Sequence, residues 1–220
     1  MATRALLAEL TAACAQPVSI EAVGGVDAAK RVQAGESFDV VVLASDAIDK
    51  LIAAGRVLAG SKVDVVQSGV AVAVPAGAAH PDITSEDAVR RAVLAAPTLG
   101  YSTGPSGMQL AELFERWGIA EQIAPRLVQA PPGVPVGALV ARGAVALGFQ
   151  QLSELMNIEG IDVLGPLPPA IQITTTFSAG VCTASTQPDA ARAVLAFLAS
   201  PDAAQTKQRH GMQSAGDQSA

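Results

Sequence analysis

Residues 32–55, VQAGESFDVVVLASDAIDKLIAAG, contain the pattern that decides the fold class. The apolar run 38–43 is typical of a strand buried on both faces. A helix is expected before it, over about 26–34. A second helix follows, because Ser45 and Asp46 can both act as N-caps and Gly55 can end the helix after about Ala54. This alternation predicts an α/β fold with mostly parallel strands and helices on both faces.

The same alternation continues along the rest of the chain. Strands are expected at about 18–23, 63–74, 98–101, 127–129, 144–149 and 171–183. Further helices are expected at about 3–15, 85–95, 106–117, 136–142, 152–156, 188–199 and 201–209. Thr3 and Thr84 are the expected N-caps of the first two of these helices. The tail after Gly211 is expected to be disordered.

The order of the elements predicts two lobes that the chain crosses between twice. Lobe I is expected to hold residues 1–75 and 176–220, and lobe II residues 76–175. The long β-branched stretches beginning near residues 63 and 171 are the expected crossover strands. Two crossings imply a cleft, and ligands of such sheets bind at the carboxyl ends of the strands.

Composition excludes several classes of function. The chain has 14 basic and 20 acidic residues, a net charge of -6, which argues against nucleic acid as a partner. No apolar run reaches the roughly 18 residues of a membrane-spanning helix, and the first 16 residues favour an amphipathic helix over a signal peptide. Cys14 and Cys182 lack metal or redox spacing, so no metal site is expected, and buried free thiols are expected over the alternative of a disulfide. No cofactor is expected. A monomer is expected.

The most informative motif is YSTGPSG, residues 101–107, between an expected strand and an expected helix. The hydroxyls of Ser102, Thr103 and Ser106, with the open N–H groups near Gly107, could hold an anion without a basic side chain. The alternative is an ordinary strand-to-helix turn that Ser106 caps. Tyr101 and Glu154 are the acid/base candidates near these segments.

Two further segments could contribute to the same ligand site. Gly24 and Gly25 could leave backbone N–H groups open at a helix start, or could simply form a turn. Gln150 follows an apolar strand, where its amide could orient a ligand or simply end the strand. His80 and His210 are expected at the surface, and the absence of GxSxG disfavours serine hydrolysis.

The chain resembles the periplasmic binding proteins of the second type, especially the molybdate-binding branch. The resemblance rests on YSTGPSG, on residues 32–55, on ARGAVALGFQQLSEL at 141–155 and on AFLASPDAAQTKQRHGM at 196–212. It implies an oxyanion held by serine hydroxyls and by N–H groups at helix starts. Carried over by position, these contacts fall at Gly24, Gly25, Ser106, Gly107, Val136 and Gln150, with Thr3 or Arg4 standing in for a missing first loop. Glycines occupy the first lobe's serine positions, and Gln150 replaces a tyrosine.

The resemblance implies a periplasmic solute-binding protein that captures a small oxyanion or carboxylate and delivers it to the membrane component of an ABC transporter. A cytoplasmic location is the alternative, because the chain shows no clear signal peptide. Some relatives of this branch isomerise small tricarboxylates such as aconitate, which makes isomerase activity the alternative function. A third possibility is the effector-binding domain of a regulator.

Overall fold

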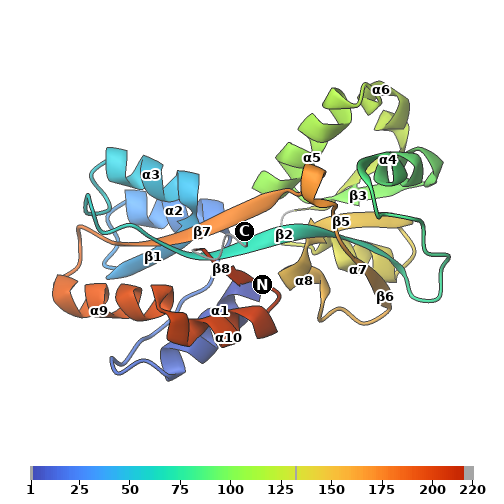
Figure 1. Ribbon diagram of the computed structural model, residues 1–220. Helices are drawn as coiled ribbons and strands as arrows, with labels where there is room; N and C mark the ends of the chain where they lie inside the picture. Colours follow the sequence, from blue (N-terminus) through green and yellow to red (C-terminus); the bar gives the residue numbers. More distant parts are fainter. Residues whose placement is uncertain (1, 132, 216–220) are drawn as a thin grey trace. The chain divides into compact units, whose positions relative to one another are not determined.

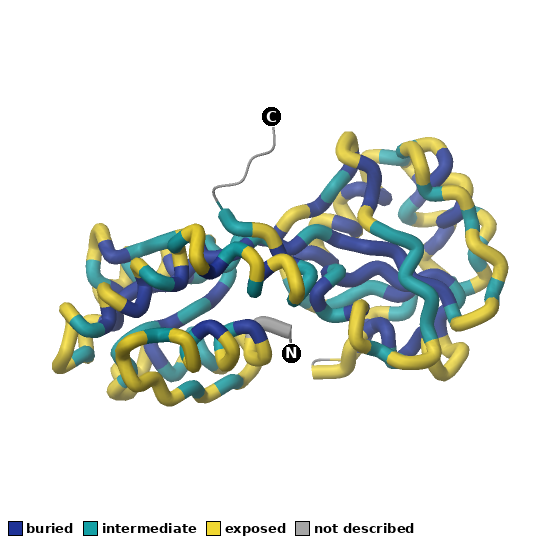
Figure 2. The backbone as a smooth tube through the Cα atoms, turned by 60° about the horizontal axis from the view of Figure 1, so that its bottom comes forward, coloured by how far each residue is buried: buried dark blue, intermediate teal, exposed yellow. Residues whose placement is uncertain are grey.

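The computed structural model describes residues 2–131 and 133–215, and the chain folds into two compact units. Unit 1 holds Met1–Ser68 and Thr175–Ala220, and unit 2 holds Gly69–Thr174. The chain passes from one unit to the other within β2 (Val63–Pro75) and returns at the first residue of β7 (Thr174–Val181) (Figure 1). Each unit has its own sheet and its own apolar cores, and buried segments run through the interior of each unit in Figure 2.

Unit 1 is a three-layer arrangement around strands in the order β1-β7-β2, with β8 paired to β2. The added strands are β1 (Val40–Ala44) and β8 (Gln213–Ser214). One face carries α2 (Gly25–Gln33) and α3 (Ser45–Ala53), and the other carries α1 (Ala2–Ala12), α9 (Pro188–Ala199) and α10 (Ala204–Arg209), which follows η3 (Pro201–Ala203). Separate clusters of buried aliphatic side chains fill the two faces.

Unit 2 is built on strands in the order β2-β5-β3-β4, with β6 also paired to β2. Its strands are β3 (Leu99–Tyr101), β4 (Leu127–Gln129), β5 (Leu147–Gln151) and β6 (Ile161–Pro166). One face is covered by α4 (Glu86–Ala95), α5 (Pro105–Arg116), α6 (Ala120–Ile123) and η1 (Ala124–Arg126), and the other by α7 (Val136–Ala141) and α8 (Leu152–Leu155). The short η2 (Pro169–Ile171) precedes β7.

The α/β class with helices on both faces is confirmed, but the strand directions are more mixed than expected. β3 runs parallel to β4 and β5, whereas β1–β7, β2–β8, β2–β5 and β2–β6 are antiparallel. A parallel pair needs a crossover connection. All of unit 2 lies between β1 and β7 in the sequence, so no single helical crossover connects them and they need not be parallel.

Five local expectations are wrong. Ser45 and Asp46 lie inside the first turn of α3 and neither caps it, because the N-cap position is Ala44. Residues 17–24 form no strand, and Val18 and Val23 are 38% and 40% exposed, so their alternating pattern has no sheet to join. Thr3 lies inside α1 instead of capping it, because the helix begins at Ala2. Ser85, not Thr84, caps α4 by accepting from the Ala88 N–H at 3.2 Å. The tail forms β8 before residues 216–220, which lie outside the described part of the chain.

Thr84 fails as a cap because Asp82 engages it. The Asp82 carboxylate accepts from the N–H and the hydroxyl of Thr84 at 2.9 and 2.7 Å, and these bonds hold the pKa of Asp82 below its usual range.

β6 was not expected from the sequence, since its six residues include Gly165 with φ 130° and end at a proline. Short strands interrupted in this way carry little periodic signal.

Candidate functional site

Three strands of unit 2 end together at one edge of its sheet. Leu99 of β3 lies opposite Leu127 of β4 and Leu147 of β5, and both pairings are parallel. The segments that leave these strands therefore emerge at the same edge, which is where open α/β sheets bind ligands. They lead to the starts of α5, α7 and α8, so unit 2 brings the expected site residues of these three segments to one edge.

At the start of α5, two of the predicted serines meet. The hydroxyls of Ser102 and Ser106 are 3.3 Å apart, within hydrogen-bond distance, and Ser106 is only 6% exposed. Only one of the two hydroxyls donates in this contact, so the O–H of the other remains free to donate to a ligand. Thr103 is exposed. Gly104 caps the helix and Pro105 occupies its first turn, where a missing N–H costs nothing.

The turn into α5 is tight enough to require glycine at position 107. A Cβ on Gly107 would lie 1.9 Å from the Ser102 carbonyl oxygen and 3.2 Å from the Ser102 hydroxyl. The Gly107 N–H donates to the Gly104 carbonyl at 3.0 Å, so it is not open to a ligand as the sequence suggested. Ser106 occupies the second helical position, whose N–H has no acceptor within the helix. The donors at this point are therefore that N–H and the serine hydroxyls.

At the end of β5, Gln150 connects two neighbouring elements. Its side-chain oxygen accepts from the Gly137 N–H in the first turn of α7 at 3.3 Å, and its side-chain nitrogen donates to the Glu154 carboxylate in α8. Gln150 is 4% exposed and Glu154 is half-buried. Val136, at the start of α7, points into the core against Gly100 and Gly148, so it can offer a ligand only its backbone.

Tyr101 and Glu154, the two acid/base candidates, have different surroundings. The Tyr101 side chain packs against the apolar cluster shared by α4, α5, β2, β3 and β5, and its carbonyl accepts from the Ala130 N–H at 2.9 Å. Glu154 belongs instead to the hydrogen-bonded chain that starts at α7. The carboxylate is therefore the better placed of the two for proton transfer.

The remaining predicted residues lie in unit 1. Gly24 caps α2 and its carbonyl accepts from the Ala28 N–H at 2.9 Å. A Cβ on Gly24 would lie 3.7 Å from a carboxylate oxygen of Asp27, and one on Gly25 would meet Leu43 at the same distance. Asp27 thus places negative charge at this helix start, which opposes an anion there. Arg4 is exposed on α1, and the Thr3 side chain lies outside the described part of the structure.

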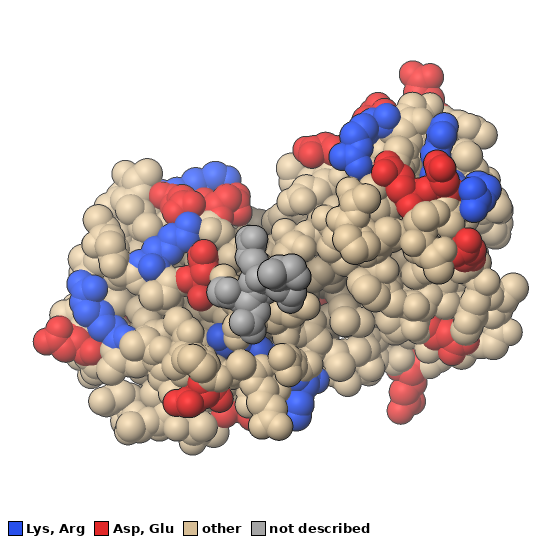
Figure 3. Space-filling model, viewed as in Figure 1, with Lys and Arg blue, Asp and Glu red and all other residues tan. Residues whose placement is uncertain are grey.

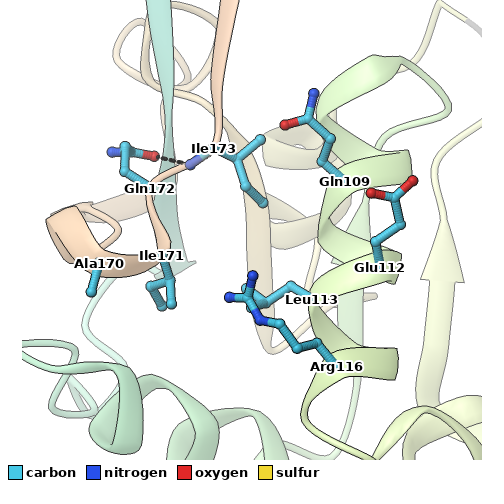
Figure 4. Close-up of a pocket in the computed structure, with 8 residues that line it drawn as sticks. All are labelled: Gln109, Glu112, Leu113, Arg116, Ala170, Ile171, Gln172 and Ile173. Atoms are coloured by element: carbon cyan, nitrogen blue, oxygen red, sulfur yellow. Dashed lines mark hydrogen bonds between the residues drawn. The ribbon is translucent and has the colours of Figure 1, made fainter.

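A pocket of about 370 Å³ lies elsewhere in unit 2, between α5 and the segment around η2 (Figure 4). Its lining comprises Gln109, Glu112, Leu113, Arg116, Ala170, Ile171, Gln172 and Ile173. The side-chain oxygen of Gln172 is already engaged, since it accepts from the Val70 and Ile173 N–H groups at 3.0 and 2.8 Å. None of the residues predicted from the sequence lines this pocket, and no motif in the sequence points to it.

Charge and metal chemistry are sparse among the residues that the structure describes. No group of three or more His, Cys, Asp or Glu side chains is placed to hold a metal ion within residues 2–131 and 133–215. In the same ranges, no helix combines the length and apolarity needed to span a bilayer. On the face shown in Figure 3, acidic and basic side chains are interspersed and form no broad basic area.

The profile of the bacterial extracellular solute-binding proteins matches residues 2–213. The chain belongs to that family. The resemblance to periplasmic binding proteins inferred from the sequence is thereby confirmed.

One sequence relative and two solved structures are similar to this chain over most of its length. An aconitate isomerase from Pseudomonas sp is 42% identical over 183 residues, 83% of this chain and 70% of the relative. The substrate-binding domain of a putative molybdenum ABC transporter from Clostridium difficile superposes with a TM-score of 0.76 at 16% identity, covering 96% of this chain and 93% of that one. The Azotobacter vinelandii periplasmic molybdate-binding protein gives 0.75 at 18% identity with the same coverage. At these identities the two structures show the shared two-lobed fold.

Proposed function

We propose that this solute-binding protein captures a small organic anion with several carboxylates, and that unit 2 holds it at the edge where β3, β4 and β5 end. The observation that carries the proposal is the contact between the Ser102 and Ser106 hydroxyls at the start of α5. Two hydroxyls and a helix start supply donors and a partial positive charge to an anion without a basic side chain. A hydrogen bond to a charged group contributes about 1.5–3 kcal/mol.

A carboxylate ligand is favoured over an inorganic oxyanion by two observations. The relative that is 42% identical to this chain is named for aconitate, which is a tricarboxylate. The two molybdate-binding neighbours are only 16% and 18% identical to this chain. Glu154 also adds a carboxylate beside Gln150, and a base at this place can act on a ligand that carries C–H protons, which molybdate lacks. Molybdate and its analogues remain the competing ligands to test.

Calorimetric titration tests this proposal with cis- and trans-aconitate, citrate, molybdate, tungstate and sulfate. We expect binding of at least one carboxylate, and a loss of about 10- to 100-fold in affinity in the double variant Ser102→Ala/Ser106→Ala. Ser85→Ala is the matched control, since it removes a helix-start serine that serves only as the cap of α4. It should cost about 1 kcal/mol of stability and leave affinity unchanged. Absence of binding to every anion in the series contradicts the proposal.

The second candidate function is isomerisation of an aconitate-like tricarboxylate, and the Gln150–Glu154 contact favours it. Glu154 would take a proton from the methylene carbon, the electron pair would delocalise over the adjacent double bond and carboxylates, and a proton would return at the former vinyl carbon. The double bond thereby moves and cis- and trans-aconitate interconvert. Proton NMR in deuterated buffer follows both exchange and conversion. No deuterium uptake at either carbon excludes this candidate.

Membership of the extracellular solute-binding family supports a periplasmic location and a transporter as partner. In that setting the protein would deliver its ligand to the membrane component of an ABC transporter. Uptake of labelled aconitate by cells with and without the gene measures this role separately from any isomerase activity. Unchanged uptake at low external ligand would rule out delivery.

A further inference from the structure

We infer that Gln150 is a positioning residue that holds Glu154 for proton transfer, instead of a donor that binds the ligand directly. The inference rests on the isomerase candidate and goes beyond it, because it assigns a role to a buried side chain next to the base. Three features of the described residues carry it: the fixed orientation of the Gln150 amide, the rigidity of its strand, and the way it leaves Glu154 available.

The orientation of the Gln150 amide is set by its two partners. The Gly137 N–H can only donate, so the oxygen of the amide must face it, at 3.3 Å. The Glu154 carboxylate accepts, so the nitrogen of the amide must face α8. Exchanging the two ends would set donor against donor and acceptor against acceptor. The amide therefore has one stable orientation, and it fixes the Glu154 carboxylate relative to the first turn of α7.

Gln150 also lies on a rigid part of unit 2. It is 4% exposed and sits opposite Ala71 in the antiparallel pair of β2 and β5. Ala71, Ala73 and Leu155 form a fully buried cluster beside this strand. Groups held on packed strands keep their geometry better than groups on loops. Glu154 follows four residues later, in the short helix α8 that begins directly after β5.

The contact leaves Glu154 able to act as a base. Gln150 donates to the Oε2 oxygen of Glu154, so the Oε1 oxygen remains for a substrate proton. Gln150 itself is neutral and neither gains nor loses a proton during the reaction. In the proton shift described above, the methylene C–H bond breaks, the proton moves to Glu154, and the same group returns a proton to the other carbon. The role of Gln150 is to fix the distance and angle of this transfer, to which rates are sensitive.

Steady-state rates of aconitate isomerisation, followed by NMR over a range of substrate concentrations, separate positioning from binding. Gln150→Met keeps the length of the side chain and removes its polar atoms. We expect kcat to fall by about 10- to 100-fold while KM changes by less than about threefold. Glu154→Gln should abolish deuterium exchange with KM retained. The control Gln151→Met alters the next residue of β5, which faces the other side of the strand, and should leave kcat unchanged.

The exchanged pair Gln150→Glu/Glu154→Gln adds a structural readout. Gln150→Glu alone places two carboxylates together and should lower Tm, and the double variant should restore Tm, because the pair again has one amide and one carboxylate. Its rate should stay at the level of Glu154→Gln, since the base has moved. A rise in KM of about tenfold or more with unchanged kcat in Gln150→Met would make Gln150 a ligand donor and overturn the inference. So would unchanged kinetics. An inactive wild-type protein would instead exclude the isomerase candidate, and the inference with it.

Discussion

Replacing Gly107 by alanine tests the tight turn at the start of α5, because the change should destabilise the protein where it usually stabilises a helix. Alanine inside a helix is usually more stable than glycine by about 0.5–1 kcal/mol. Here the added Cβ would lie 1.9 Å from the Ser102 carbonyl oxygen, while real Cβ contacts essentially never fall below 3.0 Å. Ser102 and the start of α5 must therefore separate by about 1 Å, and overpacking of this kind costs about 1–3 kcal/mol. The expected change in the free energy of unfolding has the opposite sign to the usual one.

The same displacement should weaken ligand binding. Moving Ser102 by about 1 Å takes its hydroxyl out of hydrogen-bond range, a loss of about 10- to 100-fold in affinity. Urea unfolding and calorimetric titration of Gly107→Ala measure the two effects. Gly104→Ala is the control in the same turn: its Cβ would meet only the Ser102 hydroxyl, at 3.9 Å, so less than about 1 kcal/mol should be lost. If Gly107→Ala is more stable than wild type, the close approach of Ser102 to α5 is refuted.

Two further predictions concern titratable groups of unit 1. Hydrogen bonds from His210 and Arg209 hold the pKa of Glu9 below its ordinary value of 4.5, so the stability they give is present above that pH and is lost as pH falls through the lower folded-state pKa. The Tm of Glu9→Gln should therefore fall less than the Tm of wild type between about pH 7 and about pH 3. An equal fall in both proteins would contradict this. Burial raises the pKa of Cys182 to about 11. In Ellman assays at about pH 8, Cys14 should react and Cys182 only after unfolding, whereas equal native rates would contradict its burial.

Periodic apolar patterns were the most reliable guide to the fold. The expected ranges 127–129 and 188–199 match β4 and α9, and the helix expected at 26–34 is displaced by one residue. These segments have an apolar pattern of one clear period and a partner to pack on. Residues 18–23 have the alternation but no neighbouring strand, so the local pattern misled. Pairing between distant segments, such as β8 with β2, has no local signal to read.

The site was predictable in its residue types but not in its contacts. A strand followed by serines and a helix start predicts donors at a sheet edge, and the contact of Ser102 with Ser106 forms at that point. No sequence pattern indicates that the Gly104 carbonyl accepts from the Gly107 N–H, or that Asp27 lies beside Gly24. Both depend on backbone angles within a single turn. The Gln150–Glu154 spacing of four residues could have suggested a contact on one helix, but the two residues lie on β5 and α8.

The difference between a binding protein and an enzyme at this sheet edge comes down to one carboxyl group. In the proposed site, Ser102 and Ser106 hold a substrate carboxylate both before and during a proton shift, and the part of this binding that is equal in the two states does not speed the chemical step. A base held beside the ligand does, because it acts only where the C–H bond breaks. Glu154 has that position in the proposed site through Gln150. Glu154→Gln should therefore keep aconitate affinity while exchange disappears, and a variant that loses both would show that Glu154 serves binding instead.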